Sequence, residues 1–197
     1  MTTLAEEDSK MLLYHGTGNR TISTFDFEHC KKKRDFGLGV YFSSNYDQAV
    51  EWSCHDSAEG AVYVCDLDLS SFSLLELKSQ DDDLFYILYL CRIDLEEIVP
   101  DSVDNYDKAD IIAGPLLDGK MTCFRNIAEQ FNGGDISANR FIGIVRHKLF
   151  NSTHDQYCIK TKRALDAVNA SIQKVIFTER TTDGVRTAEQ KKNRQTN

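Results

Sequence analysis

The sequence contains no apolar run long enough to cross a membrane. Its longest apolar-rich stretch extends from Leu84 to Cys91, far short of the roughly 20 residues that a spanning helix requires. The opening residues MTTLAEEDSK also lack a basic segment followed by an apolar one, so no cleaved secretory signal is visible. We therefore expect a cytoplasmic protein without membrane contact. Delivery to another cell by a different secretion route stays open.

The cysteines form no pattern that is typical of a metal site or a redox motif. They stand at positions 30, 54, 65, 91, 123 and 158, without a CxxC pair or a Cys/His grouping at zinc-ligand spacing. We expect reduced thiols and no bound metal. Cys54 and His55 are neighbours, but neighbouring side chains on a strand face opposite ways, so adjacency alone does not indicate a catalytic pair.

Basic residues are also fewer than acidic ones, with 23 Lys and Arg against 31 Asp and Glu. The formal net charge is -8, and phosphate backbones attract basic surfaces, so a general nucleic-acid binder is disfavoured. One basic cluster, Lys31 to Arg34, departs from this trend. It is either a solvated loop or a local contact to phosphate, and the sequence leaves both interpretations open.

The chain does contain enough apolar material for a core, because 41% of its 197 residues are hydrophobic. Capping, periodicity and breaker signals indicate strands at residues 11–15, 40–43, 61–69, 109–113, 156–160 and 171–178, and helices at 45–53, 82–92, 121–131, 137–150 and 162–169. These elements predict one α+β domain over residues 11–178 with a mixed or antiparallel sheet. Residues 1–10 and 179–197 are polar, and we expect the second of these segments to be a disordered tail.

The stretch LYHGTG, residues 13–18, places His15 directly before Gly16 near the start of the chain. Taken alone this is a weak signal, because a histidine at the end of a strand is commonly a hydrogen-bonded structural residue. The glycines allow two interpretations: they supply a positive φ for a tight turn, or they let a planar ligand approach the backbone N–H and C=O groups. The second interpretation requires a ligand that carries an amide.

A second motif, DFGLGVYFSS, supplies the context. It places Tyr41 after Gly39 at the start of a strand, with Ala49 and Trp52 following on an expected helix. HG followed by GxGxYF, a small residue and a helical aromatic residue resembles the nicotinamide pocket of ADP-ribosyltransferases of the diphtheria-toxin and poly-ADP-ribose-polymerase type. In that clade a histidine, a tyrosine and a carboxylate or amide on three strands form the H-Y-E constellation.

The third position of this constellation aligns best with Gln156, because the family's glutamate is followed by an aromatic residue and an apolar strand, as in QYCI. Asp155 is chemically closer to glutamate, but on a strand it faces the side opposite to Gln156, so both cannot line one pocket. Together with IIAGP-x-x-D and QYCIKTKRAL, the motifs are most similar to a bacterial branch of this superfamily, over about residues 11 to 169. Asp118 matches a recurrent acidic position there, and a turn cap is the simpler interpretation of it.

The resemblance implies an ADP-ribosyltransferase-like fold, a split sheet with peripheral helices, and a role for each matching residue. His15 would hydrogen-bond the adenosine ribose of NAD, Gly16 would bind the nicotinamide carboxamide, and Gln156 would hold the ribose hydroxyls. Tyr41 and Trp52 would enclose the nicotinamide ring. The remaining expected NAD contacts are Thr17, Arg20, Gly39 and Ser43. Arg20 and the Lys31 to Arg34 cluster lie where related domains carry diphosphate or acceptor contacts.

The implied activity is mono-ADP-ribosyl transfer from NAD to a macromolecular acceptor, expected to be a protein, with release of nicotinamide and without a metal. Gln156 departs from the pattern, because a neutral amide can neither abstract a proton nor stabilise a cation as glutamate does. We therefore do not expect chain elongation to poly-ADP-ribose. Two alternatives stay open: an NAD glycohydrolase toxin with water as the acceptor, and a non-catalytic module that binds NAD or ADP-ribose.

Overall fold

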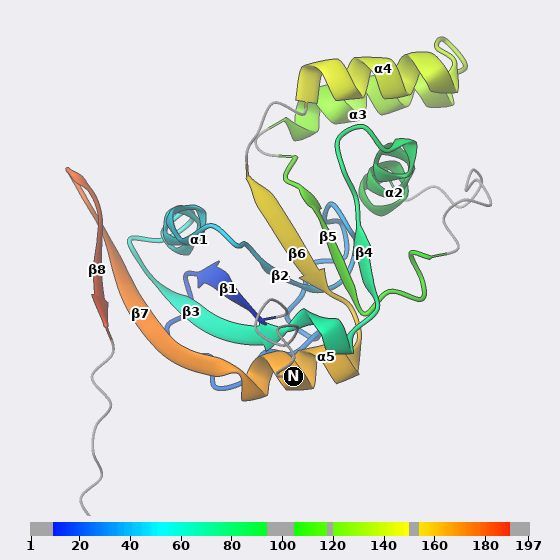
Figure 1. The fold of residues 1–197 in the computed structure, drawn as a ribbon. Helices are drawn as coiled ribbons and strands as arrows, with labels where there is room; N and C mark the ends of the chain where they lie inside the picture. Colours follow the sequence, from blue (N-terminus) through cyan, green and yellow to red (C-terminus); the bar gives the residue numbers. More distant parts are fainter. Residues whose placement is uncertain (1–9, 94–104, 118–119, 150–153, 190–197) are drawn as a thin grey trace, which may run out of the picture. The chain divides into compact units, whose positions relative to one another are not determined.

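The computed structural model describes residues 10–93, 105–117, 120–149 and 154–189 (Figure 1). The chain divides into two compact units, each assembled from segments that are distant in the sequence. We call them the first unit, which takes residues 1–25, 42–71 and 165–197, and the second unit, which takes 26–41 and 72–164. Every statement below on either unit concerns its described residues.

The first unit contains an antiparallel four-stranded sheet of order β1-β3-β7-β8. The strands are β1 (Lys10–Thr17), β3 (Glu59–Asp68), β7 (Ile172–Thr181) and β8 (Gly184–Glu189). A short 3-10 helix, η1 (Leu69–Ser71), follows β3. The inner strand β3 is buried along most of its length, in keeping with its position between two neighbours.

Helix α1 (Tyr46–Ser53) packs on this sheet, and two glycines make its close approach possible. Asn45 caps the helix by accepting a hydrogen bond from the backbone N–H of Gln48 at 3.1 Å. A Cβ added to Gly16 would overlap the carbonyl oxygen of Ala49 and lie 2.8 Å from its carbon. A Cβ added to Gly60 would lie 2.7 Å from the carbonyl carbon of Ser53. The absence of a side chain at Gly16 on β1 and at Gly60 on β3 therefore allows α1 to pack closely on the sheet.

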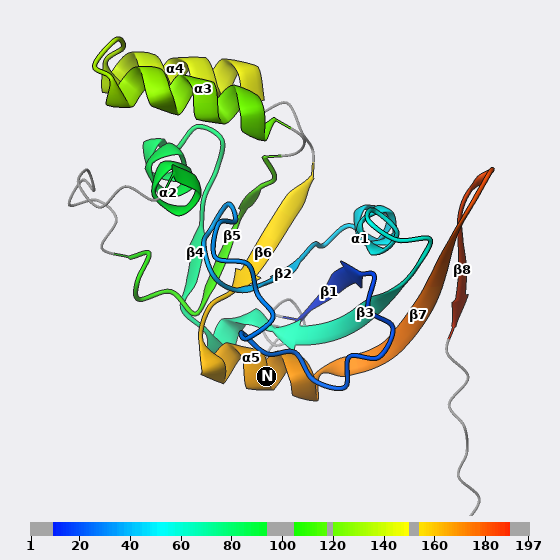
Figure 2. The same ribbon diagram turned by 180° about the vertical axis from the view of Figure 1, so that it is seen from behind.

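The second unit contains a mixed four-stranded sheet of order β2-β6-β5-β4 (Figure 2). Its strands are β2 (Val40–Phe42), whose last residue, Phe42, belongs to the first unit, β4 (Leu74–Glu76), β5 (Ile111–Pro115) and β6 (Asp155–Ile159). Strand β4 runs parallel to β5, and β5 runs antiparallel to β6. The helices are α2 (Asp82–Ile93), α3 (Met121–Asn132) and α4 (Ala138–Leu149). Helix α5 (Lys162–Ala170) begins in the second unit and ends in the first.

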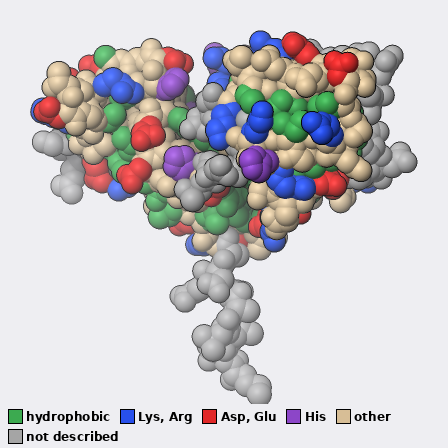
Figure 3. Space-filling view, turned by 90° about the horizontal axis from the view of Figure 1, so that it is seen from above, with side chains coloured by type: hydrophobic (Ala, Val, Ile, Leu, Met, Phe, Trp, Pro, Cys, Tyr) green, Lys and Arg blue, Asp and Glu red, His purple; other side chains and the backbone are tan. Residues whose placement is uncertain are grey.

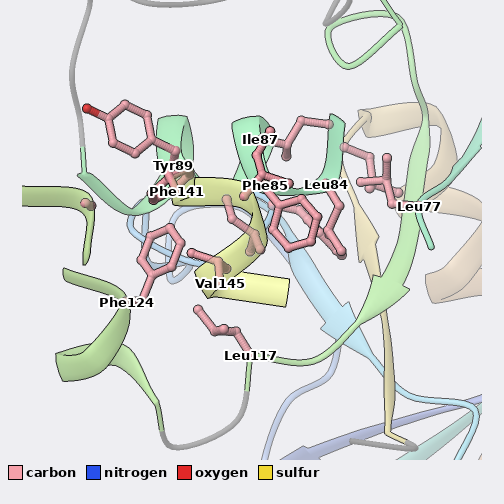
Figure 4. Close-up of a cluster of buried hydrophobic side chains, with 14 of the residues drawn as sticks. Leu77, Leu84, Phe85, Ile87, Tyr89, Leu117, Phe124, Phe141 and Val145 are labelled. Carbon is pink, nitrogen blue, oxygen red and sulfur yellow. The ribbon is translucent and has the colours of Figure 1, made fainter. Parts of the chain in front are cut away.

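The core of the second unit lies where α2, α3 and α4 pack together (Figure 4). Phe85, Phe124 and Phe141 are fully buried there. Phe141 stacks on Phe131 with ring centroids 5.0 Å apart. Tyr89 adds an edge contact to Phe141 at 5.6 Å. These aromatic pairs come from three helices, so they fix the helices to one another.

The α+β class is confirmed by two sheets and five helices among the described residues. The prediction of a disordered tail at residues 179–197 was wrong in part. Strand β7 continues to Thr181, and the paired strand β8 occupies residues 184–189. Strand β8 is mostly exposed, so it lacks the apolar alternation by which a strand is recognised in a sequence. Gly184, with φ 127°, closes the hairpin that brings β8 back along β7. Residues 190–197 lie outside the described part.

The sequence predicts neither a membrane-spanning helix nor a metal site, and the described residues bear on both predictions. Within them, no helix has the length and apolar character needed to span a membrane. In the same residues, no three His, Cys, Asp or Glu side chains gather as metal ligands would. All six cysteines are free thiols, and Cys54, Cys65 and Cys158 are buried.

Candidate active site

His15 lies near the end of β1 in an aromatic environment. Its ring centroid is 4.9 Å from that of Phe25, with the planes at 70°, and 5.4 Å from that of Phe42. Tyr63, the partner of His15 on β3, is 6.5 Å away. The imidazole is half-buried. It is thus held by rings from the loop after β1, from β2 and from β3.

Gly16 presents its backbone to the open edge of β1. The backbone N–H of Tyr14 donates to the carbonyl of Ser43 at 2.8 Å, and the N–H of Ser43 donates back at 2.9 Å. The polar groups of Tyr14 therefore point away from β3, and strand alternation directs those of Gly16 the same way. This direction fits the predicted contact of the Gly16 backbone with a carboxamide. Gly16 therefore has two roles to explain it, this predicted contact and the close packing of α1.

Tyr41 lies on β2 and holds the preceding loop through its hydroxyl. The hydroxyl donates to the carbonyl of Gly37 at 2.8 Å and accepts from the backbone N–H of Phe36 at 2.9 Å. Burial, with the nearby Cys158 thiol, raises the pKa of Tyr41 well above its ordinary value. The phenol is therefore neutral at physiological pH. It can offer a ring face and hydrogen bonds, but it does not act as a base.

Gln156 lies on β6 and is 2% exposed. Its Nε2 donates to Oδ2 of Asp35 at 2.7 Å and to the carbonyl of Pro115 at 3.1 Å. Asp35, 1% exposed, forms an ion pair with Arg92, whose Nε donates to Oδ1 at 2.7 Å. The backbone N–H of Leu117 also donates to Oδ2 of Asp35 at 3.1 Å. A buried carboxylate thus joins the predicted glutamine to an arginine of α2.

The structure brings Tyr41 and Gln156 together around one short segment of the second unit. Tyr41 binds the backbone of Phe36 and Gly37, and Gln156 binds the side chain of Asp35. Their strands, β2 and β6, are neighbours in the sheet. His15 belongs to the first unit. The convergence of all three side chains therefore stays a prediction.

Three further predicted NAD contacts have local roles. Thr17 Oγ1 accepts from the backbone N–H of Asn19 at 3.2 Å, and buried Ser43 accepts from the N–H of Asn45 at 2.9 Å before α1. A Cβ added to Gly39 would lie 2.7 Å from the carbonyl oxygen of Ile159, so this glycine lets the chain approach β6. Their contact with NAD stays a prediction.

Trp52 is half-buried on α1, and its carbonyl accepts the N–H that caps the helix. It follows from the helical spacing that Trp52 and Ala49 lie on adjoining faces of α1, and Ala49 is the residue that meets β1. The indole belongs to the first unit, with His15 and Gly16. Its expected contact with the nicotinamide ring stays a prediction.

Arg20 has a structural role in the first unit. Its guanidinium donates to the carbonyl of Gly60 at 3.0 Å and to that of Thr178 at 2.6 Å, and it pairs with Glu59 at 2.7 Å. It also lies over the ring of Phe177, 5.4 Å from the centroid. These contacts fix the loop after β1 to β3 and β7. Binding a diphosphate would require the guanidinium to exchange some of them.

The remaining charged candidates differ in what surrounds them. Lys31 to Arg34 are exposed, as expected for a solvated loop, and the carbonyl of Lys33 accepts from Arg92 at 3.0 Å. Asp155 is half-buried and, by strand alternation, faces away from Gln156. Asp118 lies outside the described residues.

Sequence reasoning missed Asp35 and Arg92. No spacing in the sequence indicates them, because the two residues meet only in the folded chain.

The comparisons with known proteins concern most of the chain. The family described as protein of unknown function (DUF3990) matches residues 11–169. This range begins in β1 and ends in α5, so it includes His15, Tyr41 and Gln156. No curated protein matches the chain, and no solved structure matches it.

Proposed function

Because the chain belongs to the DUF3990 family, described as of unknown function, we propose an activity from its own residues: mono-ADP-ribosyl transfer from NAD to a protein acceptor, on an ADP-ribosyltransferase-like fold. The observation that carries the proposal is that Tyr41 and Gln156, on the neighbouring strands β2 and β6, hold the same segment. The HG motif on β1 supplies the third element of the constellation. The proposal requires His15 to reach the same dinucleotide.

The chemistry is a heterolytic cleavage. The N-glycosidic bond of NAD breaks, its electron pair leaves with nicotinamide, and positive charge develops on the ribose. We assign the contact with the carboxamide to the Gly16 backbone at the strand edge, and aromatic contacts with the leaving group to Tyr41 and Trp52. His15 and Gln156 orient the two riboses. Each ring contact contributes on the order of 1 kcal/mol beyond its buried area.

The neutral side chain of Gln156 limits the transfer step after cleavage, because an amide takes no proton from the acceptor. Transfer therefore requires an acceptor that is nucleophilic on its own. Water would otherwise capture the ADP-ribosyl cation, and the protein would be an NAD glycohydrolase. Labelled NAD distinguishes the two outcomes, since transfer leaves label on protein and hydrolysis leaves free ADP-ribose.

The first prediction concerns His15. Incubation of the wild-type chain with NAD should release nicotinamide, measured by chromatography, and mass spectrometry of a lysate with labelled NAD should show modified protein. His15→Ala should lower nicotinamide release at least about tenfold, which corresponds to about 1.4 kcal/mol. His55→Ala is the matched control, because His55 is an exposed histidine of the first unit with 78% side-chain exposure. Equal activity of the two variants would contradict the role of His15.

A further inference from the structure

The carboxylate of Asp35 is fully buried and fully engaged. It is 1% exposed, and it accepts hydrogen bonds from the guanidinium of Arg92, the backbone N–H of Leu117 and the side chain of Gln156. Arg92 itself is anchored a second time, to the carbonyl of Lys33 at 3.0 Å. A buried charge is tolerated only when it is paired and hydrogen-bonded. Asp35 meets this condition through partners from α2, β6 and the segment after β5.

These contacts fix the orientation of the Gln156 carboxamide. Both partners of its nitrogen, Oδ2 of Asp35 and the carbonyl of Pro115, can only accept hydrogen bonds. The NH₂ group must therefore face them, and Oε1 must face the other way. Within the described part of the chain, the side-chain hydrogen bonds of Gln156 all involve Nε2. Oε1 thus takes no part in the hydrogen bonds to Asp35 and Pro115.

The same geometry explains why position 156 carries an amide. A glutamate there would place one carboxylate oxygen where Nε2 lies, against both the Asp35 carboxylate and the Pro115 carbonyl, which are 2.7 and 3.1 Å from that nitrogen. Two carboxylates so close cannot both be ionised. An aspartate at 35 and a glutamine at 156 instead place a donor against an acceptor at both contacts. The departure from glutamate is therefore linked to the presence of Asp35.

We propose that Asp35, clamped by Arg92, is the positioning residue of the site and supplies the negative charge that a glutamate at position 156 would carry. This inference rests on the proposed function. Asp35 acts through Gln156: it holds Oε1 toward the ribose hydroxyl and places its charge one side chain away from the developing cation. It takes up no proton, and the bond changes are those of the cleavage above. Because Arg92 offsets part of this negative charge, the main effect of Asp35 is to orient the Gln156 carboxamide.

The first test compares two buried aspartates of the second unit. Asp110 also binds an arginine, Arg163, and accepts from Thr161 at 2.6 Å and from the N–H of Ser73 at 2.9 Å. Asp35→Asn should lower kcat for nicotinamide release at least about tenfold, or about 1.4 kcal/mol, with KM for NAD changed little. Asp110→Asn should leave kcat within about twofold. A kcat for Asp35→Asn equal to that of Asp110→Asn would overturn the proposal.

The second test transfers the negative charge from position 35 to position 156. Gln156→Glu alone should lower the melting temperature, because it opposes two carboxylates. Adding Asp35→Asn gives the carboxylate introduced at position 156 a hydrogen-bond donor again, although the backbone N–H of Leu117 then loses the acceptor that it shares with Gln156. The double variant should therefore recover part of the lost melting temperature and nicotinamide release relative to either single variant. This variant also covers the case in which Asp35→Asn alone does not fold. Additive losses of melting temperature, or a folded double variant without activity, would overturn the inference.

The outcomes separate this inference from the function on which it rests. If the wild-type chain neither releases nicotinamide nor gives heat with NAD in calorimetry, the proposed function fails and the inference fails with it. If the wild type cleaves NAD, and Asp35→Asn cleaves it equally well despite a lower melting temperature, Asp35 is structural. In that case the proposed function survives and only the inference is lost.

Discussion

At the scale of single residues, the second unit contains polar side chains whose roles are set by burial. Burial raises the pKa of the Cys158 thiol to about 12, so this thiol beside Tyr41 is protonated at neutral pH. Burial also lowers the pKa of Lys160, whose Nζ lies 3.2 Å from the Tyr106 ring centroid. For Asp110, burial alone would raise the pKa, but hydrogen bonds from Thr161, Ser73 and Arg163 reverse the direction. Specific partners thus decide which buried groups stay charged.

A prediction at this scale concerns the exposed pair of His29 and Asp26, whose atoms Nδ1 and Oδ1 are 2.7 Å apart. The hydrogen bond from His29 lowers the pKa of Asp26 below 3.8, and Asp26 raises the pKa of His29 above 6.5. The contribution of His29 is complete below 6.5 and is lost as pH rises through its folded pKa; that of Asp26 is complete above 3.8 and is lost on acidification. The pair therefore stabilises the loop most between these values. An NMR titration should show the raised His29 pKa, and Asp26→Asn should return it toward 6.5.

At the scale of elements, the seating of α1 on β1 and β3 depends on Gly16 and Gly60. Gly16→Ala should destabilise the fold by about 1–3 kcal/mol, because the new methyl group overlaps the Ala49 carbonyl and a close-packed interface resists added volume. Gly143→Ala is the matched control. Nothing lies within 4 Å of a Cβ at Gly143 on α4, so the fold should gain about 0.5–1 kcal/mol from reduced backbone freedom.

Denaturant unfolding measures both variants. An unchanged free energy of unfolding for Gly16→Ala would show that α1 does not pack as described. If Gly16→Ala folds but loses nicotinamide release, the close approach of α1 and the backbone site for the carboxamide share the same glycine. That result would connect the packing reason for Gly16 with its proposed role in the site.

At the scale of the whole molecule, the two units take alternating parts of the chain, so neither can be removed by a single cut. A chain ending at Ala164 lacks β7 and β8, and β3 then loses the partner that pairs with it along residues 59–65. We expect the first unit to unfold in this variant. Trp52 is the single tryptophan and lies on α1 of that unit, so its fluorescence reports the change. A chain ending at Glu189 is the control, and native-like emission from the shorter chain would contradict the prediction.

Charge also belongs to this scale. The face shown in Figure 3 carries both basic and acidic side chains, so the net charge of -8 does not produce a uniformly acidic surface there. The net charge therefore disfavours general nucleic-acid binding, but it does not determine the local contacts of a dinucleotide. Those depend on individual groups such as the Gly16 backbone.

The sequence by itself determined the α+β class and most of the elements, because local signals identify them. The Asn45 cap, the glycine breakers and the helical spacing of α3 and α4 all act over a few neighbouring residues. It also indicated Tyr41 and Gln156, which fall on neighbouring strands. It did not predict β8, since that strand is polar and is held by its pairing with β7 rather than by an apolar face.

Only the tertiary structure decided what surrounds the candidate residues. Asp35, Arg92 and Gln156 come from a loop, α2 and β6, and no spacing in the chain indicates that a carboxylate, a guanidinium and an amide will meet. Gly16 proved to have a packing reason that its motif could not reveal. The physical reason is the same in both cases. Local propensity depends on neighbours in sequence, whereas burial and hydrogen-bond satisfaction depend on partners that folding brings from far away.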